Sequence, residues 1–124
     1  MYKRQPSDHE LGRVRTIDIT TTGRRSGRPA RIEIWWFRFE DRFIITGTPG
    51  RRDWYANVLA EPRMTAHVGA VDLGATAVPV DDAEFRRRFF TAGETSWYVG
   101  QAELDRLVAE APMIEVVLDR SNDG

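Results

Sequence analysis

The chain has 124 residues, no cysteine, and 19 acidic against 18 basic side chains, which leaves a formal net charge of −1. This length is typical of one domain, which we expect to span residues 1–124. The lack of cysteine excludes disulfides, thiolate nucleophiles and cysteine-based zinc sites, and His9 and His67 are too few for a histidine-rich metal site. No apolar run is long enough to cross a bilayer, and residues 1–13 lack the apolar core of a signal peptide. We therefore expect a cytoplasmic protein without a metal, and nothing indicates membrane association.

The basic residues are unusual in kind, because Lys3 is the only lysine and the other 17 of the 18 are arginine. They gather at residues 24–31, at Arg51 and Arg52, and at residues 86–88. A total charge near zero argues against nonspecific nucleic-acid binding, which needs a basic face. Genomic base composition is an alternative explanation for the arginine excess, but it accounts less well for the placement.

The first predicted elements form a hairpin. Residues 1–13 lack clear periodicity and are expected to form an N-terminal arm or one short helix. In residues 15–22, Ile17 and Ile19 alternate with polar residues, which predicts a half-buried strand. Residues 23–29 hold two glycines and a proline but no apolar side chain, a composition typical of a turn.

Residues 30–39 are predicted to form one strand whose apolar positions change face along its length. They are even-numbered at first and odd-numbered from Trp35 onward, so both faces of the second half must be covered. This pattern fits a central barrel strand with a bulge near the two tryptophans. It fits equally a strand whose outer face meets a flat ligand or a second subunit. Residues 40–42 then turn the chain into a short apolar strand over 43–46.

The middle of the chain begins with a loop over residues 48–52. Asp53 is expected to cap the N-terminus of a short helix that ends before Pro62. The apolar residues of this helix are Trp54, Val58 and Leu59.

Two further strands follow this helix. Residues 64–68 alternate in a way that turns His67 outward, which argues against a metal or catalytic role for that histidine. Residues 71–80 form a longer strand in which Gly74 and Pro79 indicate a bulge and a sheet edge.

The last third of the chain is predicted to contain two helices and a strand. Asp81 and Glu84 resemble a capping box that opens a helix with two phenylalanines on one face, and residues 86–88 are expected on its solvated side. The predicted fold class is mainly β with short helices (α+β), with about six mostly antiparallel strands. Hairpin links between neighbouring strands favour an antiparallel barrel over a βαβ sheet. The remaining elements are a helix over residues 101–110 and a strand over residues 113–119.

Catalytic side chains are scarce in this sequence. There is no pair of carboxylates, no Ser/His/Asp set and no phosphate-binding glycine loop of the Walker type, so an enzyme built on this chain would depend on a bound cofactor. Arginines in loops 23–29 and 48–52, the second just before a helix N-terminus, are suited to a ligand with several negative charges. The alternative is that these arginines are merely solvated. Nearby aromatic residues are placed either to wall a planar ring or to fill the core: Trp35, Trp36, Trp54 and Tyr55.

Three segments carry a family resemblance: TTTGRRSGRP at residues 20–29, TGTPGRRDWYAN at residues 46–57, and Glu61-Pro62. In order and spacing they resemble the deazaflavin-dependent nitroreductase family, within the flavin and deazaflavin oxidoreductase superfamily. The resemblance covers about residues 15–68. It implies a split β-barrel similar to FMN-binding proteins and a site for coenzyme F420, whose phosphate and oligoglutamate tail are anionic.

The resemblance also implies which residues bind the coenzyme. The phosphate or tail would lie against Arg24, Arg25 and Ser26, with Arg51 and Arg52 in the second loop. The ring system would be lined by the strand Ala30, Arg31, Ile32, Glu33, Ile34 and Trp35, largely through its backbone. The ring edge would meet Thr46, Gly47, Thr48 and Pro49, and the pocket would be completed by Asp53, Trp54 and Asn57.

The expected activity is hydride transfer from the reduced deazaflavin to an electron-poor small molecule, such as an activated alkene, a quinone or a nitroaromatic. Tyr98, Tyr55 or a water would deliver the proton, since a phenol with its ordinary pKa of about 10 can donate at neutral pH. Three alternatives stay open: an FMN-binding oxidoreductase on the same barrel, a non-catalytic deazaflavin carrier, and a nucleic-acid-binding barrel, which the net charge disfavours. A homodimer and a monomer are both compatible with the two-sided aromatic segment over residues 35–39.

Overall fold

The computed structural model describes residues 7–93 and 95–119, so the first six residues of the expected N-terminal arm lie outside the described part. In chain order the elements are α1 (Asp8–Gly12), β1 (Thr16–Thr22), β2 (Pro29–Trp35), β3 (Phe37–Phe39), β4 (Arg42–Thr46), α2 (Asp53–Ala60), β5 (Arg63–Val68), β6 (Val71–Pro79), α3 (Ala83–Thr91), the 3-10 helix η1 (Ser96–Gly100), α4 (Leu104–Glu110) and β7 (Met113–Leu118). Within the described ranges, no helix is long and apolar enough to span a membrane.

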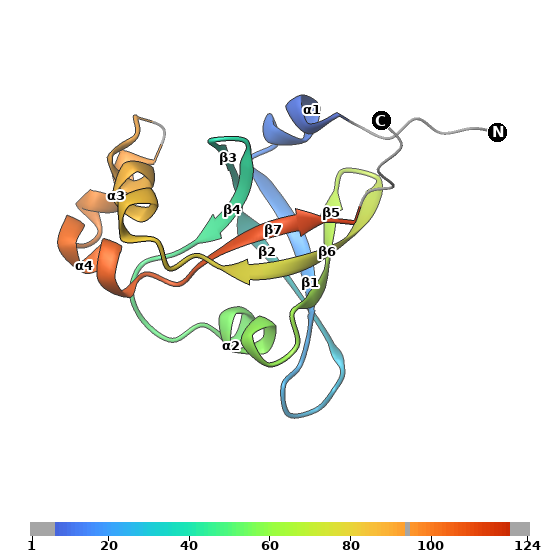
Figure 1. Cartoon of the computed structure of the whole chain (residues 1–124). Coiled ribbons are helices and arrows are strands. Elements are labelled where there is room, and N and C mark those ends of the chain that lie inside the picture. The colour runs from blue at the N-terminus through green and yellow to red at the C-terminus, as the bar shows by residue number, and fades with distance from the viewer. Residues whose placement is uncertain (1–6, 94, 120–124) are drawn as a thin grey trace.

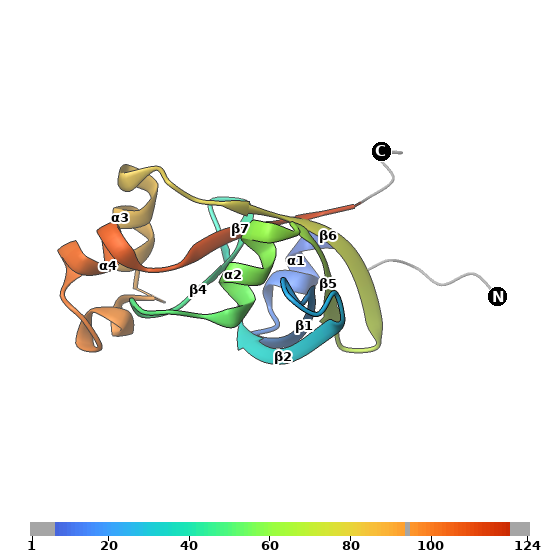
Figure 2. The same ribbon diagram turned by 90° about the horizontal axis from the view of Figure 1, so that it is seen from below.

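The strands form one antiparallel sheet in the order β2-β1-β5-β6-β7-β4-β3. The sheet curls so that β2, at one edge, approaches β4 near the other edge. Helix α2 lies below the curled sheet beside the β1–β2 hairpin, whereas α3 and α4 gather at one end (Figures 1 and 2). The expected antiparallel barrel with short helices is confirmed, with seven strands where the sequence indicated about six.

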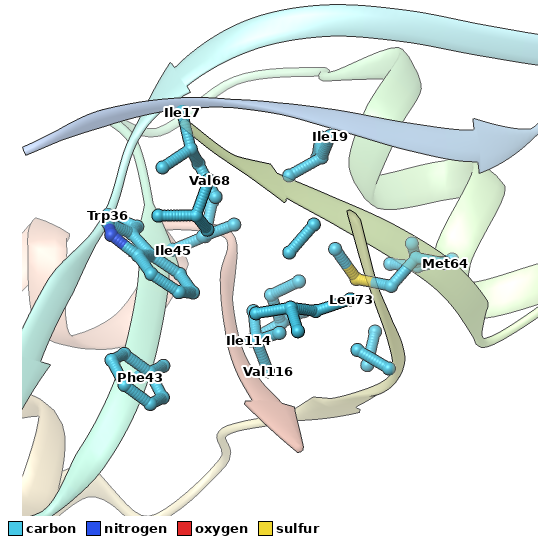
Figure 3. Packing of buried hydrophobic residues seen from close by; sticks show 14 of the residues in the cluster. Ile17, Ile19, Trp36, Phe43, Ile45, Met64, Val68, Leu73, Ile114 and Val116 are labelled. Atoms are coloured by element: carbon cyan, nitrogen blue, oxygen red, sulfur yellow. The ribbon is translucent and has the colours of Figure 1, made fainter. Parts of the chain in front are cut away.

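The main core fills the inside of the curled sheet (Figure 3). Ile17 and Ile19 point inward from β1, as their alternation predicted. Trp36 is fully buried there, stacks on Phe43 with ring centroids 4.4 Å apart, and donates its indole N–H to the carbonyl of Val14 at 3.0 Å. This hydrogen bond satisfies the one polar group of an otherwise apolar side chain.

A second core joins β3 and β4 to the helices at the end of the sheet. Phe85 and Phe89 share the buried face of α3, as predicted, and Phe89 packs edge-on against Phe37 of β3 with centroids 5.5 Å apart. Leu107 adds the buried face of α4 to the same cluster.

The predicted single strand over residues 30–39 is wrong in its continuity. The chain breaks at Trp36, and its two halves lie at opposite edges of the sheet, as β2 and β3. The apolar positions change face because Trp36 enters the main core and Phe37 enters the second core. The first half therefore forms an exposed edge strand rather than a central strand covered on both faces.

Three local predictions are wrong: two helix caps lie one residue away from the predicted position, and one strand predicted at a sheet edge lies inside the sheet. Arg52, not Asp53, is the N-cap of α2, and Asp53 is the first helical residue. Asp82, not Asp81, caps α3, with its carboxylate accepting the N–H groups of residues 84 and 85. Pro79 ends β6, which lies inside the sheet between β5 and β7 rather than at an edge.

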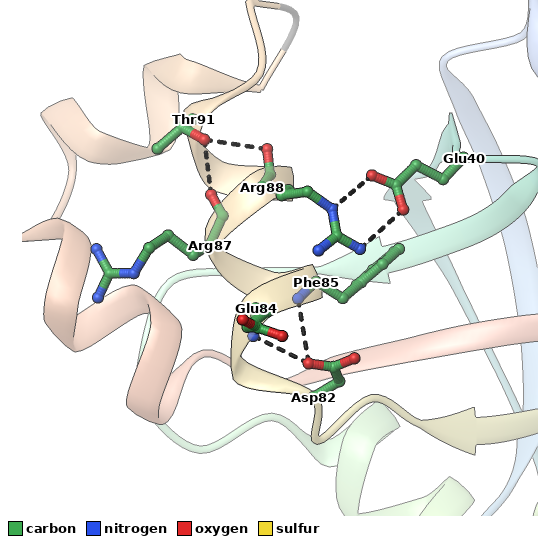
Figure 4. A network of polar contacts seen from close by, with 7 residues as sticks. All are labelled: Glu40, Asp82, Glu84, Phe85, Arg87, Arg88 and Thr91. Atoms are coloured by element: carbon green, nitrogen blue, oxygen red, sulfur yellow. Dashed lines mark hydrogen bonds and ion pairs between the residues drawn. The ribbon is translucent and has the colours of Figure 1, made fainter.

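The arginine run at residues 86–88 is not uniformly solvated. Arg87 and Arg88 are exposed, as expected, and Arg88 forms a two-pronged ion pair with Glu40 of the β3–β4 turn at 2.7 and 3.0 Å (Figure 4). Arg86, however, is only 6% exposed. It lies on the face of α3 that also carries Phe89 and Phe90, three and four residues further on, and this spacing makes it a core residue.

Candidate functional site

Two arginine-bearing loops meet at the start of α2. One is the β1–β2 hairpin loop, residues 23–28, and the other is the β4–α2 connection, residues 47–52. Between them lies a cavity of about 500 Å³, which we call the basic cavity. Its lining residues are Arg24, Arg25, Gly50, Arg51, Arg52, Asp53, Tyr55, Ala56 and Leu59.

The hairpin loop owes its shape to small residues. Gly27 has φ of +70°, a left-handed conformation that favours glycine. A Cβ at Gly23 would lie 2.6 Å from the hydroxyl of Ser26, so only glycine leaves room for that side chain to fold inward. The Ser26 hydroxyl accepts the N–H of Arg28 at 3.1 Å, which helps to close the turn.

Arg24 connects this loop to α2. Its backbone N–H and its Nη1 both donate to the side-chain oxygen of Asn57, at 3.1 and 2.9 Å, and its Nη2 lies 3.3 Å from Asp53. Asn57 is only 5% exposed, and its own N–H donates to the hydroxyl of Thr21 at 3.1 Å. Three segments, β1, the hairpin loop and α2, are thereby joined through one buried amide.

The second loop is organised around Arg52. Its Nη2 donates to both the carbonyl and the hydroxyl of Thr48 at 2.9 Å, and its Nη1 donates to the carbonyl of Arg51 at 3.0 Å. Gly50 has φ of +137°, and a Cβ there would lie 3.1 Å from the Arg52 guanidinium. The loop therefore wraps around its own arginine.

The charge of the basic cavity is strongly positive, because four arginines line it and Asp53 is its single acidic residue. Within residues 7–93 and 95–119, neither the Arg25 nor the Arg51 side chain has a hydrogen-bond or ion-pair partner. In the described part of the chain no side chain caps the N-terminus of α2, and the N–H groups of its first turn add a favourable field for an anion. Free guanidinium groups beside a helix N-terminus fit a phosphate or carboxylate group, which is the chemistry of the F420 tail.

Not every residue expected at the site lines this cavity. The β2 residues from Ala30 to Trp35 lie on the exposed edge strand, where Trp35 is 49% exposed, and Arg31 pairs with Asp18 at 2.8 Å. Thr46 is buried, and its hydroxyl donates to the carbonyl of Pro112 at 2.6 Å. The segment from Gly47 to Pro49 is half-buried beside it, and Trp54 packs in the main core.

The two candidate tyrosines lie in different surroundings. Tyr55 is half-buried and borders both the basic cavity and a neighbouring cavity of about 510 Å³ that reaches α3 and α4. Tyr98 is only 4% exposed and packs edge-on against Phe37 and Phe90. Burial raises the pKa of Tyr98 to about 12, which makes its phenol a weaker acid than a solvated one.

Sequence reasoning missed the apolar part of the basic cavity. Leu59, one of the apolar residues of the predicted helix, is 54% exposed and lines the cavity together with Ala56. The spacing along α2 held the signal, because Tyr55 and Leu59 are four residues apart and therefore share a face. The adjacent face carries the buried Trp54 and Val58.

Comparison with known proteins identifies the family. A structure described as an F420-H2 dependent reductase shares 21% identity over 82% of this chain and 92% of that chain, with a TM-score of 0.62. A FAD-binding protein from Mesorhizobium loti shares 13% identity over 89% of this chain and 85% of that chain, with a TM-score of 0.63. A structure described as a domain-swapped dimer shares 24% identity over 87% and 83% of the two chains, also with a TM-score of 0.63.

These likenesses confirm the split β-barrel fold. The family model for F420H(2)-dependent quinone reductase matches residues 2–109 of the 124-residue chain. This match confirms the resemblance found in the sequence motifs, and it supports F420 rather than FMN as the coenzyme. The chain belongs to the F420H(2)-dependent quinone reductase family.

Proposed function

We propose that this reductase passes a hydride from reduced F420 to a planar, electron-poor acceptor, with quinones as the first candidates. The observation that carries the proposal is the basic cavity, where two free arginines face the N-terminus of α2. The scarcity of catalytic side chains agrees with a protein that leaves the chemistry to its coenzyme. When bound, the reduced coenzyme supplies the hydride.

The protein's own contribution is to bind and orient both reactants. We assign the coenzyme's anionic tail to the basic cavity and its ring to the exposed strand β2 and the segment from Thr46 to Pro49. Trp35 of β2 is an exposed aromatic residue, and such a side chain favours a flat, apolar partner. Holding donor and acceptor in contact removes much of the entropic barrier to hydride transfer.

The acceptor also needs a proton. Tyr55 is the better placed of the two tyrosines, because it is half-buried and borders the basic cavity. Tyr98 keeps its proton more firmly, since burial raises its pKa to about 12. We therefore assign proton delivery to Tyr55 or to a water beside it.

Anaerobic oxidation of F420H2, followed by absorbance, tests this proposal. We expect the protein to accelerate oxidation by a menadione-like quinone, and the same assay with a nitroaromatic and an activated alkene ranks the acceptor classes. A reaction without protein gives the background rate. Tight coenzyme binding with no acceleration by any acceptor would contradict the proposal and would favour a coenzyme carrier.

A further inference from the structure

The four arginines of the basic cavity are not equivalent in their contacts. Arg24 makes three hydrogen bonds that join the hairpin loop to α2, through Asn57 and Asp53. Arg52 makes three that stay within its own loop, to Thr48 and to the Arg51 carbonyl. Both guanidinium groups are therefore already occupied before any ligand arrives.

The geometry around Arg52 shows how closely the loop encloses it. Atoms added as a Cβ would lie 3.1 Å from its guanidinium at Gly50 and 3.5 Å from its Nε at Gly47. Two glycines thus allow the backbone to pass close to this side chain. Without the guanidinium, the carbonyl and hydroxyl of Thr48 would lose their shared donor.

Arg25 and Arg51 present the opposite case. Both side chains are exposed, and in the described part of the chain neither meets an acceptor or a carboxylate. They lie on the two opposing loops that line the basic cavity. Exposed cations without an ion-pair or hydrogen-bond partner add little to the stability of a fold, so we expect these two arginines to contribute little to the coenzyme-free protein.

We infer that the four arginines divide into two working pairs. Arg24 and Arg52 are positioning residues that set the shape and separation of the two loops, whereas Arg25 and Arg51 bind the anionic groups of the coenzyme. The inference rests on the proposed function for its ligand. Its structural half, the positioning role, holds for the coenzyme-free protein as well.

The chemistry of lysine separates the two roles. An ammonium keeps the charge of arginine but lacks its planar fork, so it replaces a free cation well and a multiply bonded guanidinium poorly. Arg25→Lys and Arg51→Lys should bind F420 within about twofold of the wild type. Arg25→Gln and Arg51→Gln should each lose about fivefold at low salt, and most of that loss should vanish at about 1 M salt, where charges are screened beyond roughly 3 Å.

The positioning pair, Arg24 and Arg52, should differ from Arg25 and Arg51 in its tolerance of lysine and in its salt dependence. For Arg24 and Arg52, the Lys and Gln variants should weaken F420 binding to a similar extent, and the loss should persist at high salt, because it comes from a displaced loop. The melting temperature of the coenzyme-free protein should fall in these four variants. It should stay unchanged or rise slightly in the four variants of Arg25 and Arg51.

The experiment is a matched set of eight variants, each measured for F420 affinity at two salt concentrations and for coenzyme-free melting temperature. Arg106→Gln is the control, because Arg106 is an exposed arginine of α4 that pairs with Glu110, and neither residue lines the basic cavity. The inference is overturned if Arg52→Lys or Arg24→Lys binds like the wild type while the glutamine variant loses affinity in a salt-dependent way. Failure of the wild type to bind F420 would instead contradict the proposed function, and the melting temperatures would still test the positioning roles.

Discussion

Replacing Arg86 with methionine should remove a large part of the protein's stability. Arg86 lies on the buried face of α3 and donates to the carbonyls of Val80 at 2.8 Å, Leu107 at 3.2 Å, Val108 at 2.6 Å and Ala111 at 2.5 Å. These carbonyls belong to the end of α4 and to the segment that follows β6. One guanidinium thus ties α3 to two other parts of the second core.

The size of the effect follows from these contacts. Four hydrogen bonds at about 1 kcal/mol each give a gross loss of about 4 kcal/mol in the free energy of unfolding. Part of this is recovered, because burial disfavours the charged guanidinium and lowers the pKa of Arg86. A net loss of about 2–4 kcal/mol would lower the melting temperature by roughly 8–16 °C in a domain of this size.

Urea unfolding, followed by circular dichroism, measures the loss. Arg86→Lys should fall between the wild type and Arg86→Met, since an ammonium has three donors and cannot reach all four carbonyls. Arg87→Met and Arg88→Met on the same helix are matched controls that should change the midpoint little, because both are exposed. An Arg86→Met variant that unfolds at the same urea concentration as Arg87→Met would show that these four hydrogen bonds do not stabilise the fold.

Three other predictions concern single groups. Because the folded state holds the Tyr98 proton more tightly, stability should fall by up to about 2–3 kcal/mol as pH rises from 10 towards 12, and Tyr98→Phe should abolish this slope in urea midpoints measured against pH. The hydrogen bond from Arg88 lowers the pKa of Glu40, so the stability that this pair adds is present above pH 4.5 and is lost as pH falls through the lower, folded-state pKa. Acid titration of Arg88→Gln should lack that component. Asn57→Leu should lower the free energy of unfolding by about 2 kcal/mol, because the backbone N–H of Arg24 loses its acceptor. A urea midpoint equal to that of the wild type would contradict a stabilising role for the Asn57 hydrogen bonds.

Much of the sheet was predictable because a half-buried strand alternates. Ile17 and Ile19 in β1, and the apolar residues of β5, pointed inward as their period of two required. The break at Trp36 was not predictable in the same way, because a change of apolar face looks alike in a bulged strand and in a chain that leaves one edge of a sheet for the other. Only the tertiary placement of Trp36 and Phe37 in two separate cores distinguishes them.

The positive charge of the candidate site was predictable from the sequence, but the hydrogen-bond partners of its arginines were not. Loop composition placed arginines near a helix N-terminus, and the structure brings Arg25 and Arg51 to one cavity. Arg52 donates hydrogen bonds within its own loop because the backbone at Gly50 passes close to its guanidinium. Loop composition does not specify that backbone geometry. Arg86 was misassigned for a related reason: in a run of three arginines, charge was given more weight than helical spacing.

Coenzyme binding by the basic cavity is tested by a pair of titrations of the purified protein, one with F420 and one with FMN, at low and high salt. We expect saturable, micromolar binding of F420 that weakens with salt, because free arginines bind the anionic tail, and weaker binding of FMN, which carries one phosphate. Absence of F420 binding, or F420 affinity that does not change with salt, would contradict this expectation.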